Sequence, residues 1–117
     1  MSNEISKQIL EEMLDHGVLV IKFVENKPLH KSIVNQIIRS ATSVGANYSE
    51  AQDASSKKDF LNKIYIAKKE SAETTYWLKL IARLLGESSE LSALQDRTQR
   101  FTMILQKILN SSRAKSS

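Results

Sequence analysis

Apolar residues recur at alternating steps of three and four along most of the chain, the spacing that places them on one side of an α-helix. The pattern predicts four helices, over residues 4–26, 31–53, 57–86 and 89–110. It is most regular in the third, at Phe60, Ile64, Ala67, Ser71, Thr74, Leu78, Ile81 and Leu85. The other three carry comparable apolar seams, which begin at Ile5, Ile33 and Leu91.

Residues that start or end helices stand between these segments. Pro28 ends the first helix, because its ring blocks the preceding turn and it lacks a backbone N–H. Ser56 precedes Asp59 in a capping-box spacing, and Gly86 follows an apolar run as a C-cap does. Short loops make successive helices antiparallel neighbours. The sequence therefore predicts an all-α protein, an antiparallel up-and-down four-helix bundle over residues 1–110 with a flexible tail at 111–117.

Composition excludes several classes of protein. The 117 residues contain no cysteine, which removes disulfides, thiolate nucleophiles and cysteine-bound zinc. The longest purely apolar run, at 17–21, falls far short of the roughly 20 residues that span a bilayer. The N-terminus lacks the basic and then apolar regions of a signal peptide. We therefore expect a cytoplasmic protein without membrane association.

Signatures of catalysis or metal binding do not emerge from the sequence. Ferritin-like di-iron bundles use Glu-x-x-His pairs, but neither Glu70 nor Glu73 has a histidine at the matching step. His16 lies on the apolar seam of the first helix, where we expect a hydrogen-bonded core-edge residue rather than a ligand. A divalent cation held by Glu50, Glu70 and Glu73 is the minor alternative. We expect no enzyme activity, no cofactor and no bound metal.

The segment 31–53 carries a second, polar arc beside its apolar one. Four of its polar residues fall within about 80° when each residue turns the helix by about 100°. Serine and asparagine are poor residues for a helix interior unless their side chains find partners, and Gly45 favours a close neighbour. A solvated surface is the alternative. We predict a structural polar seam, packed against another helix or subunit, formed by Arg39, Ser43, Asn47, Glu50, Glu70 and Glu73.

The segment 57–86 is apolar on two sides. Its second stripe lies away from the regular seam and gives the helix more apolar surface than one four-helix core buries. A wide core face is the alternative. We predict a subunit interface, with the tryptophan as its anchor, formed by Ile66, Trp77, Leu80 and Leu84.

A third side of this segment is basic and aromatic. Lys57, Lys68 and Lys79 stand eleven residues apart, or about three helical turns, so they line up on a side without acids. Cations neutralise phosphates and aromatic rings stack on bases. A solvated lysine row is the alternative. The net charge of +4, which is concentrated after residue 30, permits a nucleic-acid site at Lys57, Lys58, Lys68, Lys69, Lys79, Arg83, Tyr65 and Tyr76.

The middle of the chain resembles a known family. The stretches that carry the resemblance are QIIRSATSV (36–44), NYSEA (47–51), KDF (58–60), IA (66–67), KESAET (69–74) and WL (77–78). They resemble the four-helix bundle proteins of the 23S ribosomal RNA intervening-sequence family, and the likeness extends over about residues 5–110. Ala51 stands where this family commonly has glycine.

The resemblance implies a four-helix bundle that forms a ring-like homo-oligomer, a pentamer, in a bacterial cell. The family's biochemical role is not established, and RNA association is a suggestion. A related group serves as accessory subunits of reverse transcriptases. We therefore predict a non-enzymatic homo-oligomer that binds nucleic acid, structured RNA before DNA, through basic faces. The alternative is a protein-interaction scaffold that recruits a nucleic-acid enzyme such as a reverse transcriptase.

Overall fold

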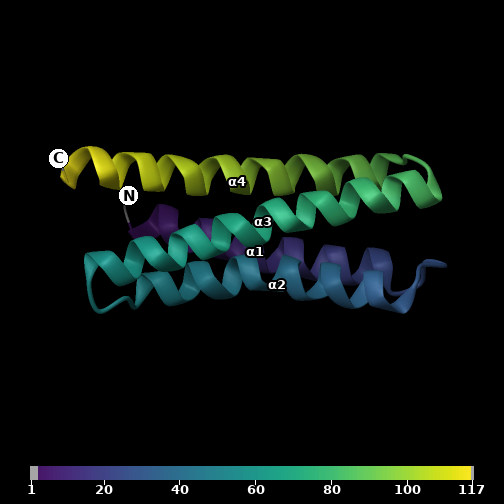
Figure 1. Ribbon diagram of the computed structural model, residues 1–117, viewed down its shortest axis with the longest axis horizontal. Coiled ribbons are helices and arrows are strands. Elements are labelled where there is room, and N and C mark those ends of the chain that lie inside the picture. Colours follow the sequence, from purple (N-terminus) through teal and green to yellow (C-terminus); the bar gives the residue numbers. More distant parts are fainter. Residues whose placement is uncertain (1–2, 117) are drawn as a thin grey trace.

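Three short connections join four helices in the computed structural model, which describes residues 3–116 and measures 47 × 24 × 20 Å (Figure 1). The helices are α1 (Asn3–Val24), α2 (Lys31–Gln52), α3 (Lys57–Leu85) and α4 (Ser89–Ser116). Each packs antiparallel against the next, and among the four neighbouring pairs of helices α1 and α4 contact each other least. The predicted antiparallel four-helix bundle is confirmed. No helix among the described residues is long and apolar enough to cross a membrane.

Capping residues set the helix ends close to where the sequence predicts them. The Ser56 hydroxyl accepts a hydrogen bond from the Asp59 backbone N–H at 3.0 Å, and Asp59 accepts one from the Ser55 backbone N–H at 3.4 Å. Gly86 ends α3 with a φ of 91°, a conformation that L side chains rarely adopt.

The end of α4 differs most from the prediction. This helix continues to Ser116, six residues past the predicted end at 110, because residues 111–116 contain no glycine or proline to stop it. The predicted flexibility of the tail stays a prediction, and residue 117 lies outside the described residues.

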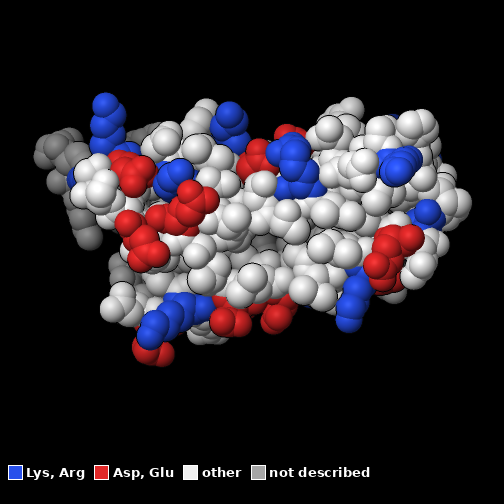
Figure 2. All heavy atoms as spheres, turned by 90° about the horizontal axis from the view of Figure 1, so that it is seen from below, with Lys and Arg blue, Asp and Glu red and all other residues white. Residues whose placement is uncertain are grey.

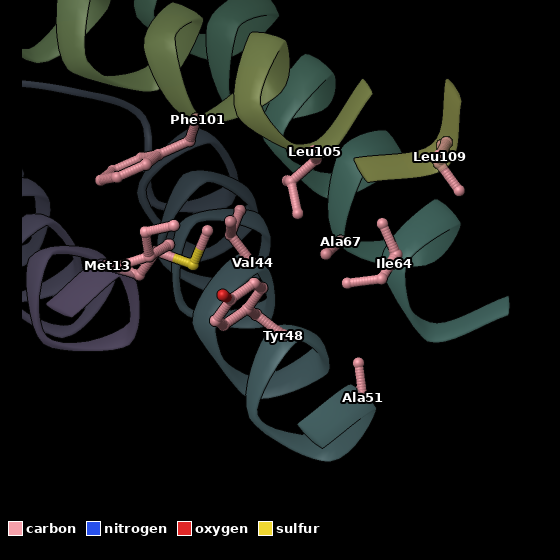
Figure 3. Close-up of a cluster of buried hydrophobic side chains, with 10 residues drawn as sticks. Met13, Val44, Tyr48, Ala51, Ile64, Ala67, Phe101, Leu105 and Leu109 are labelled. Carbon is pink, nitrogen blue, oxygen red and sulfur yellow. The ribbon is translucent and has the colours of Figure 1, made fainter. Parts of the chain in front are cut away.

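Two apolar clusters fill the interior. In the first, side chains of all four helices point toward one another (Figure 3), and it includes Ile9, Met13, Val44, Tyr48, Ala51, Ile64, Ala67, Phe101, Leu105 and Leu109. The second comprises Val20, Phe23, Val24, Ile37, Ala41, Leu78, Ile81, Leu91 and Leu94. Ile5, where the predicted seam of α1 begins, is 52% exposed. That expectation was wrong, because the buried side of α1 begins only at Ile9. Beside the first turn of α1, a cavity of about 410 Å³ is lined by residues that include Asn3 and Ser6 of α1 and Ile104 and Ile108 of α4.

A layer of buried polar side chains lies between the two clusters. His16 of α1 is only 3% exposed, and its Nε2 lies 2.7 Å from the Thr98 hydroxyl of α4. The Thr98 hydroxyl donates to the Leu94 carbonyl within α4, at 2.8 Å. Buried hydroxyls also join α2 to α3, where Thr74 lies 2.9 Å from Ser40. The predicted role of His16 as a hydrogen-bonded seam residue is confirmed for Nε2, whereas its buried Nδ1 has no hydrogen-bond partner among the described residues.

Candidate functional site

The outward side of α3 is dominated by cations. Five of the six predicted there are exposed, namely Lys57, Lys58, Lys69, Lys79 and Arg83. The sixth, Lys68, is half-buried because it leans onto α4, where its Nζ donates to the Gln106 side-chain oxygen at 2.7 Å. The structure therefore places the six predicted cations on one side of the bundle, where Lys68 contacts α4. We call the surface formed by these α3 cations and the adjoining side of α4 the α3–α4 face.

Two tyrosines stand among these cations with much of their rings in solvent. Tyr65 is 46% exposed and Tyr76 is 58% exposed. The Nζ atoms of Lys68 and Lys69 each lie 5.8 Å from the centroid of the Tyr65 ring, within the range of a cation–π contact. The Tyr76 ring meets the Trp77 ring edge-on at 5.0 Å, which holds it in place. Both rings are therefore accessible and partly fixed.

The neighbouring side of α4 adds a row of neutral polar residues that the sequence analysis did not single out. They recur at steps of three and four and comprise Gln95, Gln99, Thr102, Gln106 and Asn110. Contacts place several of them next to α3: Gln106 accepts from Lys68, and the Thr102 hydroxyl lies 2.6 Å from that of Ser71. The spacing of these polar residues in the sequence could have indicated that they share one side of a helix. That spacing does not single out a binding surface, because uncharged polar rows are typical of any solvated helix.

Acids leave most of the cations on the α3–α4 face unneutralised. The ion pairs found among the side chains of residues 3–112 join Arg39 to Glu70 and Glu73, Lys63 to Glu50, and Arg100 to Glu12. None of those pairs includes Lys58, Lys69, Lys79 or Arg83. Among the cations of α4, Arg100 reaches toward α1 through Glu12, and Lys107 lines the α1–α4 cavity. Positive charge on the α3–α4 face thus comes from α3.

Part of the predicted polar seam forms a cluster at the edge between α2 and α3. Arg39 donates to Glu70 at 2.9 Å and also to Glu73, and the Trp77 indole N–H donates to Glu73 at 3.0 Å. The Trp77 hydrogen bond, together with Arg39, holds the pKa of the Glu73 carboxyl below its usual range. The Arg39 side chain is 47% exposed, so the cluster lies at the surface rather than in the core.

The remaining members of the predicted seam do not join this cluster. The Ser43 hydroxyl donates to the Arg39 carbonyl at 2.7 Å, and the Asn47 amide donates to the Ser43 carbonyl at 2.9 Å, both within α2. Glu50 pairs instead with Lys63, at 3.2 Å. Within the described part of the chain, no three His, Cys, Asp or Glu side chains lie close enough to hold a metal ion.

The predicted subunit interface on α3 is partly covered within the protomer. Ile66, Trp77 and Leu80 are half-buried, and Trp77 packs against the second apolar cluster, whereas Leu84 is 58% exposed. The underside of the bundle in Figure 1, where α2 lies, is mostly uncharged across its centre, with cations and acids mixed near its margins (Figure 2). No continuous basic surface is seen on that underside.

The fold and this surface define a small four-helix bundle protein with a basic, tyrosine-bearing face. The chain belongs to the family of 23S rRNA-intervening sequence proteins, whose model matches residues 5–110. It is also similar to a solved structure from Bacteroides thetaiotaomicron, a protein of unknown function from the S23 ribosomal protein family. The identity is 33% and the TM-score 0.79, over 86% of this chain and 97% of that one. Comparison with curated proteins finds no match.

Proposed function

We propose that this protein is a non-enzymatic homo-oligomer that binds nucleic acid, structured RNA in particular, through the α3–α4 face. The observation that carries the proposal is a group of exposed α3 cations, interleaved with two exposed tyrosines, that form no ion pair among the described side chains: Lys58, Lys69, Lys79 and Arg83. Such a surface matches a phosphate backbone in charge and bases in stacking capacity. Membership of a family described by ribosomal RNA intervening sequences supports RNA as the first ligand to test.

Self-association strengthens the electrostatic argument. One protomer with a net charge of +4 attracts a polyanion weakly. When several copies are joined, each additional phosphate contact is intramolecular, and avidity raises the affinity without any new kind of contact. The half-buried and exposed apolar residues of α3, with Leu84 the most exposed, support self-association.

The decisive experiment is a gel-shift series with ribosomal RNA fragments at several salt concentrations. The triple variant Lys58→Gln, Lys69→Gln, Lys79→Gln removes three cations from the α3–α4 face. The matched control Lys7→Gln, Lys22→Gln, Lys31→Gln removes the same charge from exposed positions on α1 and α2. We expect the first variant to lose most of its binding and to show a shallower salt dependence, while the control keeps both. Equal losses, or no shift even at low salt, contradict the proposal.

A protein-interaction scaffold is the second candidate, and a separate observation favours it. Leu14 and Val18 of α1 are 54% and 49% exposed, and Met103 of α4 is 59% exposed. Exposed apolar side chains of this size are typical of protein contacts when they form a continuous patch. Recovery of one dominant partner in a pull-down, combined with no RNA binding at low salt, would favour the scaffold. That partner should be lost in the variant Leu14→Glu.

A further inference from the structure

We infer that the α3–α4 face selects unpaired over duplex segments of a structured RNA, because Tyr65 and Tyr76 stack on unpaired bases. The inference rests on the proposed function and names the class of ligand. Phosphate contacts alone would accept a duplex or a single strand, so the selection has to come from the two rings and from the neutral amides on the neighbouring side of α4.

The first step is the placement of the rings. Tyr65 and Tyr76 are eleven residues apart on one helix, which is close to three full turns, so they project from nearly the same side about 16 Å apart along the axis. Both are large aromatic side chains left 46% and 58% exposed on an otherwise cationic surface. Exposed tyrosine rings are not required for a row of solvated lysines, and rings that are only partly buried contribute little to the core. Neither role therefore explains the two rings.

The second step is the difference between the two ligands. In a duplex the faces of the bases are stacked on one another, so a protein surface meets phosphates, sugars and base edges only. In a single strand the π-face of each base is available, and every base has one, so stacking is tolerant of sequence. The rings are about 16 Å apart along the helix axis, several times the rise of about 3.4 Å between successive bases of a duplex strand. Each ring therefore takes a different base of the same strand.

The third step is the charge beside each ring. Lys68 and Lys69 hold their ammonium groups 5.8 Å from the centroid of Tyr65, and Lys79 follows Tyr76 by three residues on the same helix. A nucleotide whose base stacks on a tyrosine thereby brings its phosphate within reach of a cation. The contact of Tyr76 with Trp77 limits the motion of that ring, which lowers the entropic cost of stacking.

The fourth step is the neutral row on α4. Gln99 and Asn110 are exposed, and Gln106 is half-buried between Lys68 and Asn110. Amide side chains offer both donors and acceptors, which suits the free Watson–Crick edges of unpaired bases. They add no negative charge that would repel the strand. On the α3–α4 face, cations can thus contact phosphates, tyrosine rings can stack on bases, and amides can hydrogen-bond with base edges.

Fluorescence anisotropy provides the test, with a labelled 12-nucleotide RNA strand that cannot pair with itself, its duplex with the complementary strand, and the DNA strand of the same sequence. We expect the RNA strand to bind at least tenfold more tightly than the duplex at one fixed salt concentration. Tyr65→Ala and Tyr76→Ala should each weaken single-strand binding by about fivefold or more. The variants Tyr65→Phe and Tyr76→Phe keep the rings and should stay within about twofold of the original. Leu14→Ala, which removes an exposed apolar side chain from α1, is the matched control and should change nothing.

The outcomes separate this inference from the proposed function. Equal binding of strand and duplex, lost in the triple lysine variant but unchanged in both alanine variants, would overturn the inference and leave the proposed function standing. Absence of binding to all three ligands at low salt would overturn both. Single-strand binding that depends on both rings supports the inference, and the RNA and DNA strands then identify which sugar is preferred.

Discussion

His16 is kept neutral by its place between α1 and α4. The side chain is 3% exposed, its Nε2 is hydrogen-bonded to the Thr98 hydroxyl, and the Phe101 ring meets it edge-on at 5.4 Å. Burial lowers the pKa of His16 to about 4, with smaller contributions from the positive charges of Arg97 and Arg100. A protonated imidazole at this position would lie in a poorly solvated space beside two cations. Stability must therefore respond to the protonation of this residue.

We predict that the free energy of unfolding falls by about 3 kcal/mol, through His16 alone, as the pH is lowered from about 6.5 to about 4. In this range the unfolded chain binds a proton at this histidine and the folded protein does not, so acidification favours unfolding. Below pH 4 both states are protonated and this contribution no longer changes. Urea unfolding of the protein and of His16→Gln at several pH values measures the effect. The carboxylates are the same in the original protein and in the His16→Gln variant, so a difference between the two pH profiles reports His16. Parallel pH profiles of the two proteins would contradict the prediction.

Glu73 accepts hydrogen bonds from two different residues at the edge of α2 and α3. Glu73→Ala removes the acceptor of the Trp77 indole and one partner of Arg39, and we expect it to cost about 1 kcal/mol, because both groups remain partly solvated. Glu73→Gln keeps an acceptor for Trp77 and should cost less. Thermal or urea unfolding checks both values. If the two variants are equally destabilised, the ion pair rather than the indole hydrogen bond carries the effect.

At the scale of helices, α1 and α2 approach closely where Gly45 faces Met13. A Cβ atom added at Gly45 would lie 3.4 Å from the Met13 Cβ, at the near limit of ordinary contact. The sequence-based expectation of a close neighbour at this glycine is confirmed. There is room for a methyl group at this point and for nothing larger.

We therefore predict opposite effects for two substitutions at this position. Gly45→Ala should be neutral or stabilising by up to about 1 kcal/mol, because alanine favours the helix. Gly45→Leu should destabilise by about 1–3 kcal/mol or more, because it pushes α1 away from α2. Urea unfolding distinguishes these outcomes. Destabilisation by alanine as large as that by leucine would mean that the helices are closer than the structure indicates.

The sequence predicted the structure correctly where a single local feature determines where a helix begins, where it ends or which side is buried. Ser56, Gly86 and the buried seam of α3 from Ile64 to Ile81 were predicted because capping and three–four periodicity are local properties. Leu85, the last residue of the predicted seam, is 37% exposed because it lies in the final turn of the helix.

The predicted end of α4 at 110 was wrong, because the small polar residues that follow do not stop a helix when glycine and proline are absent. Ile5 was wrongly predicted to be buried, because the apolar spacing along α1 does not show at which turn the buried seam begins. The role of the α4 amides beside Lys68 depends on packing between helices, which periodicity in one helix does not reveal.

At the scale of the whole molecule, the mutual arrangement of α2 and α3 limits where a second copy can bind. Part of the predicted interface on α3 already makes contacts within one chain, because Trp77 packs on the second apolar cluster and donates to Glu73. Trp77→Ala would therefore destabilise the folded chain as well as any interface. Leu84, near the end of α3, is 58% exposed and is not part of either apolar cluster. It is the cleaner probe of self-association.

We predict that the protein is oligomeric at micromolar concentration, and that Leu84→Glu shifts it toward the monomer because a carboxylate would have to be buried at the interface. Multi-angle light scattering measures the mass, and a fivefold protomer mass is the expected value. Met103→Glu is the matched control, since Met103 is 59% exposed on α4 and lies outside the predicted interface. A monomeric original protein would contradict self-association altogether. Dissociation by the Met103 variant and not by the Leu84 variant would instead place the subunit contact on α4, close to the nucleic-acid face.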